Sequence, residues 1–184
     1  MTFPWDELNV IRSRVEAQEI SETAEDGGKK YDAEKCIDIV YEYLEMAWTM
    51  GVDNVNENLS TSFAPQDAEM RSAIYQKVAD KDFTERIREW SEKGDFEAIM
   101  KVADTDAHRV LNESAFNTAK KAGARFKTWK CSFHNSRDTH MALHNTTIGI
   151  DDYFVNYNGN KTLFPGAFGI AEEDCNCMCW LEFT

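Results

Sequence analysis

Histidine and cysteine, two residue types that often bind transition metals, gather in the second half of the chain. Apart from Cys36, all of them lie beyond residue 100, at His108, Cys131, His134, His140, His144, Cys175, Cys177 and Cys179. His140 and His144 would share one face of a helix, and the last three cysteines would share one face of a strand. Imidazole nitrogen with thiolate sulfur favours zinc. The candidate ligands of a structural zinc ion are Cys131, His134, His140 and Cys177.

The same residue types could instead support catalysis, because a thiolate beside an imidazole is the activated pair of a cysteine hydrolase. No standard signature is complete, however. The chain has no Cys-x-x-Cys pair, and the spacing from His140 to His144 lacks the glutamate of the zincin helix. We therefore predict no enzymatic activity and no required cofactor. The alternative is a metal-dependent or cysteine-dependent hydrolase that uses Cys131, His134, His140 and Cys177.

Two groups of charged residues lie near these side chains in the sequence. Arg137, Asp138 and His140 could form a charge-assisted hydrogen-bond network that braces the start of a short helix. Glu172, Glu173 and Asp174 resemble a carboxylate pair for acid-base chemistry, but they fall in a predicted loop. We expect these three carboxylates to be solvated at the surface.

Apolar periodicity predicts helices through the first two thirds of the chain. A first helix is expected over about residues 6–25, before Asp26-Gly27-Gly28 breaks the pattern. Asp32 has the chemistry of the N-cap of a second helix, which reaches Met50 or continues to Leu59.

Two further helices are predicted after Pro65. The first of them carries apolar residues from Ile74 to Trp90 on one side and ends near Gly94. The second covers residues 95–122, with Gly123 as its C-terminal cap.

The pattern changes after Gly123, where alternation and β-forming residues predict strands. Strands are expected over residues 125–131, 146–150 and 177–183, a short helix over 137–143, and turns at 156–160 and 165–166. Helices first and a small sheet last indicate an α+β fold. We predict a helical arm or bundle over residues 1–95 and a small α+β domain over 96–184, with a short, mostly antiparallel sheet.

The charge balance disfavours nucleic acid as a partner of the whole chain. The chain has 33 Asp and Glu against 20 Lys and Arg, a formal net charge of -13. Such a balance repels phosphate. A short basic stretch from Lys120 to Lys130 is expected to be solvated. No apolar run is long enough for a membrane span, and the scattered, odd number of cysteines indicates a reducing compartment.

Five short motifs follow one another in the second half with characteristic gaps. They are Thr105-Asp106-Ala107-His108-Arg109 with Asn112, Lys127-Thr128-Trp129, Arg137-Asp138-Thr139-His140, Leu163-Phe164-Pro165-Gly166 and Asn176-Cys177-Met178-Cys179. Their order resembles the phage Mu F-like, or phage head morphogenesis, family of minor head proteins, over about residues 98–181. In three departures from the family pattern, Met178 replaces an arginine, Asp106 replaces a glutamate and Cys175 is an additional thiol.

The resemblance implies a structural role. Family members are minor head (capsid) proteins of tailed bacteriophages or prophages, which associate with the portal and the inside of the head and assist head morphogenesis or DNA delivery. The expected partners are portal and capsid or scaffold proteins, and the expected locations are the virion head interior and, during assembly, the cytoplasm of the bacterial host. A prophage-derived adaptor that binds a host protein through the helical arm is a further alternative.

The family motif implies a set of fold-defining residues in this chain, with no catalytic residue among them. This set is Arg109, Asn112, Trp129, Arg137, Asp138, His140, Pro165, Gly166, Asn176, Cys177 and Cys179.

Overall fold

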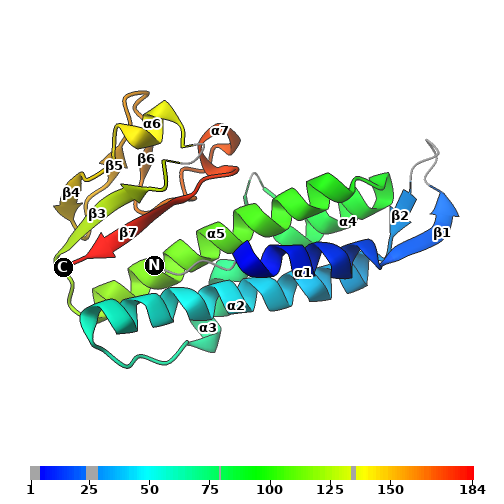
Figure 1. Cartoon of the computed structure of the whole chain (residues 1–184), viewed down its shortest axis with the longest axis horizontal. Coiled ribbons are helices and arrows are strands. Elements are labelled where there is room, and N and C mark those ends of the chain that lie inside the picture. Colours follow the sequence, from blue (N-terminus) through cyan, green and yellow to red (C-terminus); the bar gives the residue numbers. More distant parts are fainter. Residues whose placement is uncertain (1–4, 24–28, 79, 134–135) are drawn as a thin grey trace.

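Two long helices that run side by side in the same direction form the spine of the molecule (Figure 1). They are α2 (Ala33–Leu59) and α5 (Phe96–Lys121). The computed structural model describes residues 5–23, 29–78, 80–133 and 136–184. Helices α1 (Trp5–Glu16) and α4 (Phe83–Lys93) reach the starts of the long helices, α3 (Asp67–Ile74) packs beside the last turns of α5, and the strands of the second half lie over that end of α5. This confirms the predicted α+β fold with an N-terminal helical region.

The first helix is shorter than its sequence pattern predicts. Helix α1 (Trp5–Glu16) buries Ile11 and Val15 and then gives way to strand β1 (Glu19–Thr23). Strand β1 pairs antiparallel with β2 (Lys29–Tyr31). The prediction of a helix to residue 25 is wrong because Ile20, which continued the apolar spacing, is 39% exposed. Because the Ile20 side chain does not join a hydrophobic core, this segment forms a strand that pairs with β2.

Helix α2 keeps the ends that its sequence indicated. The Asp32 side chain accepts a hydrogen bond from the Lys35 backbone N–H, as expected of an N-cap, and Glu34 lies in the first turn. The helix continues past Met50 to Leu59, the longer of the two predicted ends, and stops at Ser60 in the left-handed conformation.

The predicted third helix is in fact two helices. Helix α3 (Asp67–Ile74) and helix α4 (Phe83–Lys93) are separated by a short bridge between Val78 and Lys81. Asp82 starts α4 with a capping box, in which its side chain accepts from backbone N–H groups while Glu85 reaches back to its own N–H. The prediction of one helix is wrong because the capping box at Asp82 starts a new helix, although the apolar residues keep helical spacing across the break.

Helix α5 belongs to both hydrophobic cores of the molecule. From Ile99 to Leu111 its buried side chains pack with the other helices, whereas Ala115, Phe116 and Ala119 pack against the small sheet. The Asp95 side chain caps its start, and Gly123 follows its end with φ +84°. The domain boundary between residues 95 and 96 stays a prediction. A boundary there assigns α5 to the second domain alone, although its side chains belong to both cores.

The main sheet of the second half has the order β4-β3-β7, and both pairings are antiparallel. The strands are β3 (Phe126–Cys131), β4 (Thr147–Gly149) and β7 (Cys179–Phe183), each close to a predicted strand. The pairing of β3 with β7 places Cys131 opposite Cys179 and Trp129 opposite Leu181. These partners therefore point to the same face of the sheet.

Smaller elements fill the segments between these strands. The short helix predicted near residue 140 is α6 (Asp138–Met141). The sequence analysis did not predict the hairpin of β5 (Phe154–Val155) and β6 (Lys161–Thr162), or the short helix α7 (Ala171–Asp174). Within the described residues, no helix combines the length and the hydropathy that crossing a membrane requires.

The basic stretch at the end of α5 and in β3 is not simply solvated. Lys127 is fully buried, where its ammonium donates to the Leu163 carbonyl at 2.9 Å and lies 4.7 Å from the centre of the Phe116 ring. Around it, Lys120 pairs with Asp151, Lys121 with Glu69 and Lys130 with Glu182. The expectation of a solvated run is therefore wrong for Lys127, because its aliphatic stem fills the space between aromatic rings.

Burial of Lys127 predicts a pH-dependent cost. Burial lowers the pKa of Lys127 to about 8 from a usual value near 10.5. The unfolded chain therefore binds more protons between those pH values, and the cost of the buried charge is complete below pH 8 and disappears as the pH rises toward 10.5. Replacing Lys127→Met should raise the free energy of unfolding relative to wild type more at pH 7 than at pH 10, by roughly 1–3 kcal/mol.

Urea denaturation at both pH values measures this difference. The exposed Lys161→Met variant on β6 is the matched control and should behave alike at the two pH values. A Lys127→Met effect that does not change with pH would contradict a depressed lysine pKa.

The two long helices approach each other closely at Gly51. A Cβ atom at this position would lie 1.9 Å from Ser114 Oγ and 2.3 Å from the Leu111 carbonyl oxygen. Ser114 Oγ also donates to the Trp48 carbonyl at 2.8 Å across the same interface. The helix contact therefore has no room for a methyl group.

Gly51→Ala should lower the free energy of unfolding by about 2–4 kcal/mol, because the added methyl group must separate backbones that cannot bend around it. At an unhindered helical site a change from glycine to alanine raises the free energy of unfolding by roughly 1 kcal/mol. A decrease at Gly51 would therefore identify the close helix contact as its cause. Urea denaturation followed by circular dichroism measures the effect. Asp53→Ala, an exposed change on the same helix, should be nearly neutral.

Candidate functional site

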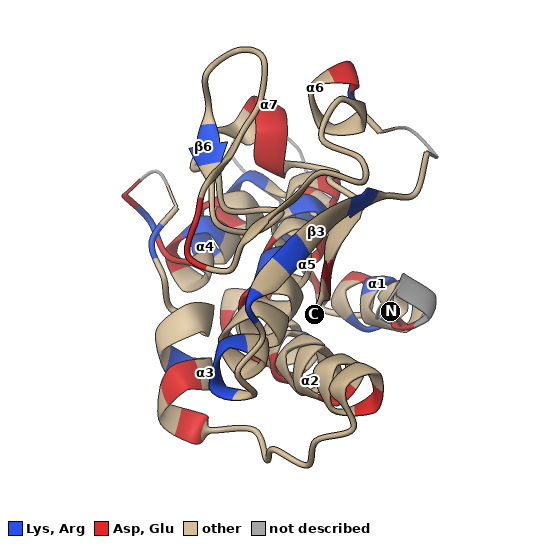
Figure 2. Ribbon diagram, turned by 90° about the vertical axis from the view of Figure 1, so that its left-hand side faces the viewer, with Lys and Arg blue, Asp and Glu red and all other residues tan. Residues whose placement is uncertain are grey.

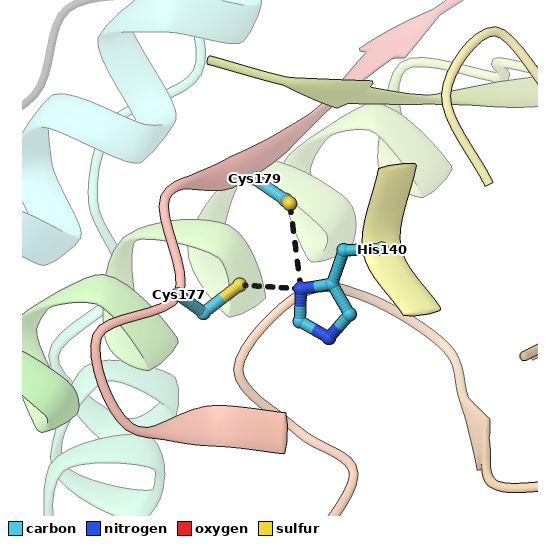
Figure 3. Close-up of side chains that lie close together, drawn as sticks. All are labelled: His140, Cys177 and Cys179. Atoms are coloured by element: carbon cyan, nitrogen blue, oxygen red, sulfur yellow. Dashed lines mark hydrogen bonds between the residues drawn. The ribbon is translucent and has the colours of Figure 1, made fainter. Parts of the chain in front are cut away.

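A buried cluster of one imidazole and three thiols lies where β3, α6 and the start of β7 meet. His140 Nδ1 is 3.5 Å from both Cys177 Sγ and Cys179 Sγ, and Figure 3 shows both sulfur atoms facing this one ring nitrogen. Cys131 Sγ lies 3.3 Å from Cys179 Sγ. All four residues are at most 4% exposed. The structure therefore brings together Cys131, His140 and Cys177, three of the four candidate ligands that the sequence indicated. Cys179 joins them in the same buried site.

Backbone geometry positions Cys131 at the end of β3 and Cys179 at the start of β7, with Cys177 two residues before that strand. Cross-strand pairing sets Cys131 opposite Cys179, and the Cys131 thiol donates to the His140 carbonyl at 3.1 Å. Asn176, with φ +53°, turns the chain just before Cys177. The left-handed conformation suits asparagine, and this turn directs Cys177 toward the same histidine.

The second ring nitrogen of His140 faces a carboxylate. His140 Nε2 lies 3.1 Å from Glu173 Oε2, an ion-pair contact without the alignment of a straight hydrogen bond. Glu173 in turn accepts from Thr139 at 2.9 Å and from Asn156 at 2.7 Å and Asn160 at 3.2 Å. The hydrogen bonds from these three side chains fix the carboxylate on the histidine.

Glu173 and Asp174 are buried, so the expectation of a solvated acidic loop is wrong for both. Asp174 accepts from three consecutive backbone N–H groups, at Phe168, Gly169 and Ile170. Both carboxylates therefore have hydrogen-bond partners that offset their burial. Glu172 alone of the three is exposed, as expected.

Aromatic rings hold the imidazole in place. The Phe168 ring stacks on His140 at 5.5 Å with an interplanar angle of 16°, and Trp129 meets the ring edge-on at 5.5 Å. Trp129 also contacts Phe154 edge-on at 5.1 Å. The histidine therefore has one packed orientation, with its nitrogens directed at the thiols and at Glu173.

Helix α5 is tied to the same cluster through the backbone of Cys179. His108 Nε2 lies 2.8 Å from the Cys179 carbonyl oxygen, and the Asn112 amide donates to that oxygen at 3.4 Å and to the His108 carbonyl at 3.0 Å. Gly166, with φ +82°, lies against His108 and Arg109, where a Cβ would be 3.0 Å from the imidazole. Residues of three separate motifs therefore meet at the junction of α5 and β7.

The electrostatics of the cluster favour a thiolate beside an imidazolium. Burial raises the pKa of Cys177, but the hydrogen bond from Cys179 and the positive charges of His108 and His140 more than reverse this, so the pKa of Cys177 falls well below its usual value. Burial lowers the pKa of His140, yet the hydrogen bond and charge of Cys177 and the charge of Glu173 raise it overall. The pKa of Cys179 is raised by its hydrogen bonds to both neighbouring thiols.

The other residues indicated by the sequence lie outside this cluster. Arg109 points into the helical side of the molecule, where it contacts Asp106 at 3.3 Å and donates to the Ala73 carbonyl at 2.9 Å. Asp138 is exposed at the start of α6, and Glu173 supplies the carboxylate beside His140. Arg137 donates to the Cys175 carbonyl, which joins α6 to the segment before β7.

The remaining candidates have simpler positions. His144 Nδ1 accepts from the Cys131 backbone N–H at 3.1 Å and faces away from the thiols into a contact with Phe133. Pro165 is buried beside Gly166, and Asn176 is exposed at its turn. His134, a predicted metal ligand, lies outside the described residues.

The arrangement suits a packed structural site better than a catalytic one. The Cys177 thiol has an activated character and an imidazole beside it, which is what a nucleophile needs. However, its side chain is buried under the closing strand, and a substrate would have to displace packed aromatic rings to reach it. The cluster is therefore placed to hold segments together or to hold an ion.

Comparison with known proteins gives two partial similarities. The chain is 29% identical over 89 residues to an NAD(+)--arginine ADP-ribosyltransferase, EFV, of Enterococcus faecalis, a match that covers 46% of this chain and 18% of that protein. It is 29% identical over 86 residues to the minor head protein GP7 of Bacillus phage SPP1, covering 45% of this chain and 28% of that protein. The chain thus spans less than a third of the length of either relative.

No family model matches the chain. No solved structure matches it either. The partial similarity to the minor head protein supports, in coarse terms, a relationship to phage head proteins.

Burial predicts the order in which the cysteines react. Cys175 is half-buried, whereas Cys36, Cys131, Cys177 and Cys179 are buried. In the native protein a short pulse of maleimide at neutral pH should modify Cys175 at least about tenfold faster than the other four, because access limits the reaction even of a thiolate. Peptide mass spectrometry measures the five rates, with the unfolded chain as reference. Preferential labelling of Cys177 would contradict a closed site and favour the cysteine hydrolase.

Proposed function

We propose that the chain is a minor head protein of a tailed bacteriophage or prophage, which docks on the portal and assists head morphogenesis or DNA delivery. The observation that carries the proposal is its 29% identity over 86 residues to the minor head protein of phage SPP1. The order of five sequence motifs adds support, because His108 and Asn112 of the first motif bind the backbone of Cys179 in the last. In this proposal the protein acts by binding other head proteins through its surface.

The distribution of charge identifies the helical half as the docking part in this proposal. Residues 1–95 carry 22 Asp and Glu against 11 Lys and Arg, whereas residues 96–184 carry 11 against 9. Almost the whole net charge of -13 therefore belongs to the helical half. Figure 2 shows acidic segments on α2 and α3, while basic residues follow β3. A surface of this kind fits a basic protein partner and repels DNA.

A hydrolase is the weaker alternative. The thiolate and imidazole at Cys177 and His140 favour it chemically, but both side chains are almost fully buried. The similarity to an ADP-ribosyltransferase covers only 18% of that protein, and it supports a shared segment more than a shared reaction.

Docking through the acidic helical surface predicts sensitivity to charge reversal. Asp53 and Glu57 are exposed and one turn apart on α2. In the full chain, Asp53→Lys with Glu57→Lys should lower copurification of a coexpressed portal protein from the same phage or prophage at least about fivefold, because two attractive charges become repulsive. Added salt should weaken the wild-type complex for the same reason.

The matched control changes the same charge in the second half, with Asp151→Lys and Glu172→Lys, which are also exposed. This variant should retain the portal protein. The full chain is needed because a fragment starting at α5 would expose the apolar side chains that pack against α2. Failure of the wild-type chain to retain the portal or capsid protein would overturn the proposed function, and equal losses in both variants would overturn docking through α2.

A further inference from the structure

We propose that the cluster around His140 is a structural zinc site, with His140 Nδ1, Cys177 Sγ and Cys179 Sγ as three ligands and Cys131 Sγ as the fourth. The first three ligand atoms all lie within 4.8 Å of one another, and all three residues are buried. The inference is independent of the proposed function, since it concerns how the second half of the chain is held together.

The spacing of the ligand atoms matches a tetrahedral site. Zinc binds sulfur at about 2.3 Å and nitrogen at about 2.0–2.1 Å, which places neighbouring sulfur and nitrogen ligands about 3.6 Å apart and two sulfurs about 3.8 Å apart. His140 Nδ1 lies 3.5 Å from both Cys177 Sγ and Cys179 Sγ. A zinc ion therefore fits between these atoms with little movement of the backbone.

Cys131 supplies the fourth ligand from the neighbouring strand. Its sulfur is 3.3 Å from Cys179 Sγ and donates to the His140 carbonyl at 3.1 Å. In the proposed site this thiol loses its proton and exchanges the His140 carbonyl for the ion. The completed set has one histidine and three cysteines, a usual donor set of structural zinc sites.

The surroundings of His140 are those of a zinc-binding histidine. Such a histidine commonly directs its second nitrogen at a carboxylate, which fixes the ring orientation and the tautomer. Glu173 Oε2 lies 3.1 Å from His140 Nε2, and Thr139, Asn156 and Asn160 hold the carboxylate in place. Packing a histidine in a core does not by itself require a carboxylate partner that three other side chains hold in place.

Four protein ligands would close the coordination shell and leave no position for water or substrate, which is the mark of a structural site. The stacked Phe168 ring and the edge of Trp129 enclose the histidine from two sides. The ligands come from β3, from α6 and from the segment that begins at Cys177 and continues into β7, so one ion would join three segments of the chain.

The first test measures metal in the full chain purified under reducing conditions without added zinc. Elemental analysis should find about one zinc ion per chain. Addition of Co²⁺ to the metal-free protein should give the thiolate charge-transfer absorption and the intense visible bands of a tetrahedral site. Chelation should lower the melting temperature, and zinc should restore it. A folded wild-type chain that holds less than about a tenth of an equivalent of zinc and gives no cobalt bands would overturn the proposal.

Variants then test each ligand. Cys177→Ser with Cys179→Ser should lose the metal, whereas Cys175→Ser and Cys36→Ser, at a half-buried neighbouring thiol and a distant buried thiol, should keep it. Cys131→Ala should weaken the cobalt charge-transfer band by about a third as one thiolate of three is lost. An unchanged band would exclude Cys131 as a ligand.

A last variant leaves all four ligands in place. Glu173→Gln should lower the zinc affinity about 10–100-fold, because the second nitrogen of His140 loses its negative partner. Competition with a coloured chelator measures the affinity, and circular dichroism verifies that the variant is folded. An affinity equal to that of wild type would overturn the role of Glu173.

Discussion

The antiparallel pairing of Cys131 with Cys179 is the contact on which the second half of the molecule depends. It sets the register of the two central strands, and the register places the two thiols on one face of the sheet. The Cys179 carbonyl is held by His108 and Asn112 of α5, and its thiol faces His140 of α6. A shift of β7 by one residue would turn the Cys179 thiol to the opposite face of the sheet and break its contacts with Cys131 and His140.

Helix α5 connects this pairing to the rest of the molecule. Its first half is packed by the helical core, and its last turns support the sheet. Because a helix is stiff over this length, the two cores cannot move independently without breaking one set of contacts. His108 and Asn112 of α5 therefore tie the backbone of Cys179 to the helical core.

Local signals explain which parts of the fold were predictable. The cap at Asp32 and the alternation in β3 are read from neighbouring residues, and the structure keeps them. The break between α3 and α4 was missed because apolar residues keep helical spacing across it. The β1 hairpin was missed because Ile20 continued the spacing of α1 without having a core to join.

The candidate site was predictable in its residue types and less so in its environment. The sequence indicated His140 and Cys177 through their chemistry, but the burial of Glu173 depends on Thr139, Asn156 and Asn160, which folding brings to it from separate segments. Lys127 was misjudged for the same reason, since its burial depends on Phe116 and on the Leu163 carbonyl. Whether a charged residue is solvated is decided by its partners in space, which spacing along the chain does not record.

The burial of so much charge in a small core has an energetic consequence. The core of the second half contains His140, Glu173, Asp174 and Lys127, each of which loses hydration on folding. Hydrogen bonds offset that cost without a large net gain, since the unfolded chain makes equivalent bonds to water. Small cores therefore commonly need a crosslink or a metal to become stable. An ion between the thiolates and His140 would bind the crowded thiols and the buried imidazole directly and so join β3, α6 and the segment that enters β7.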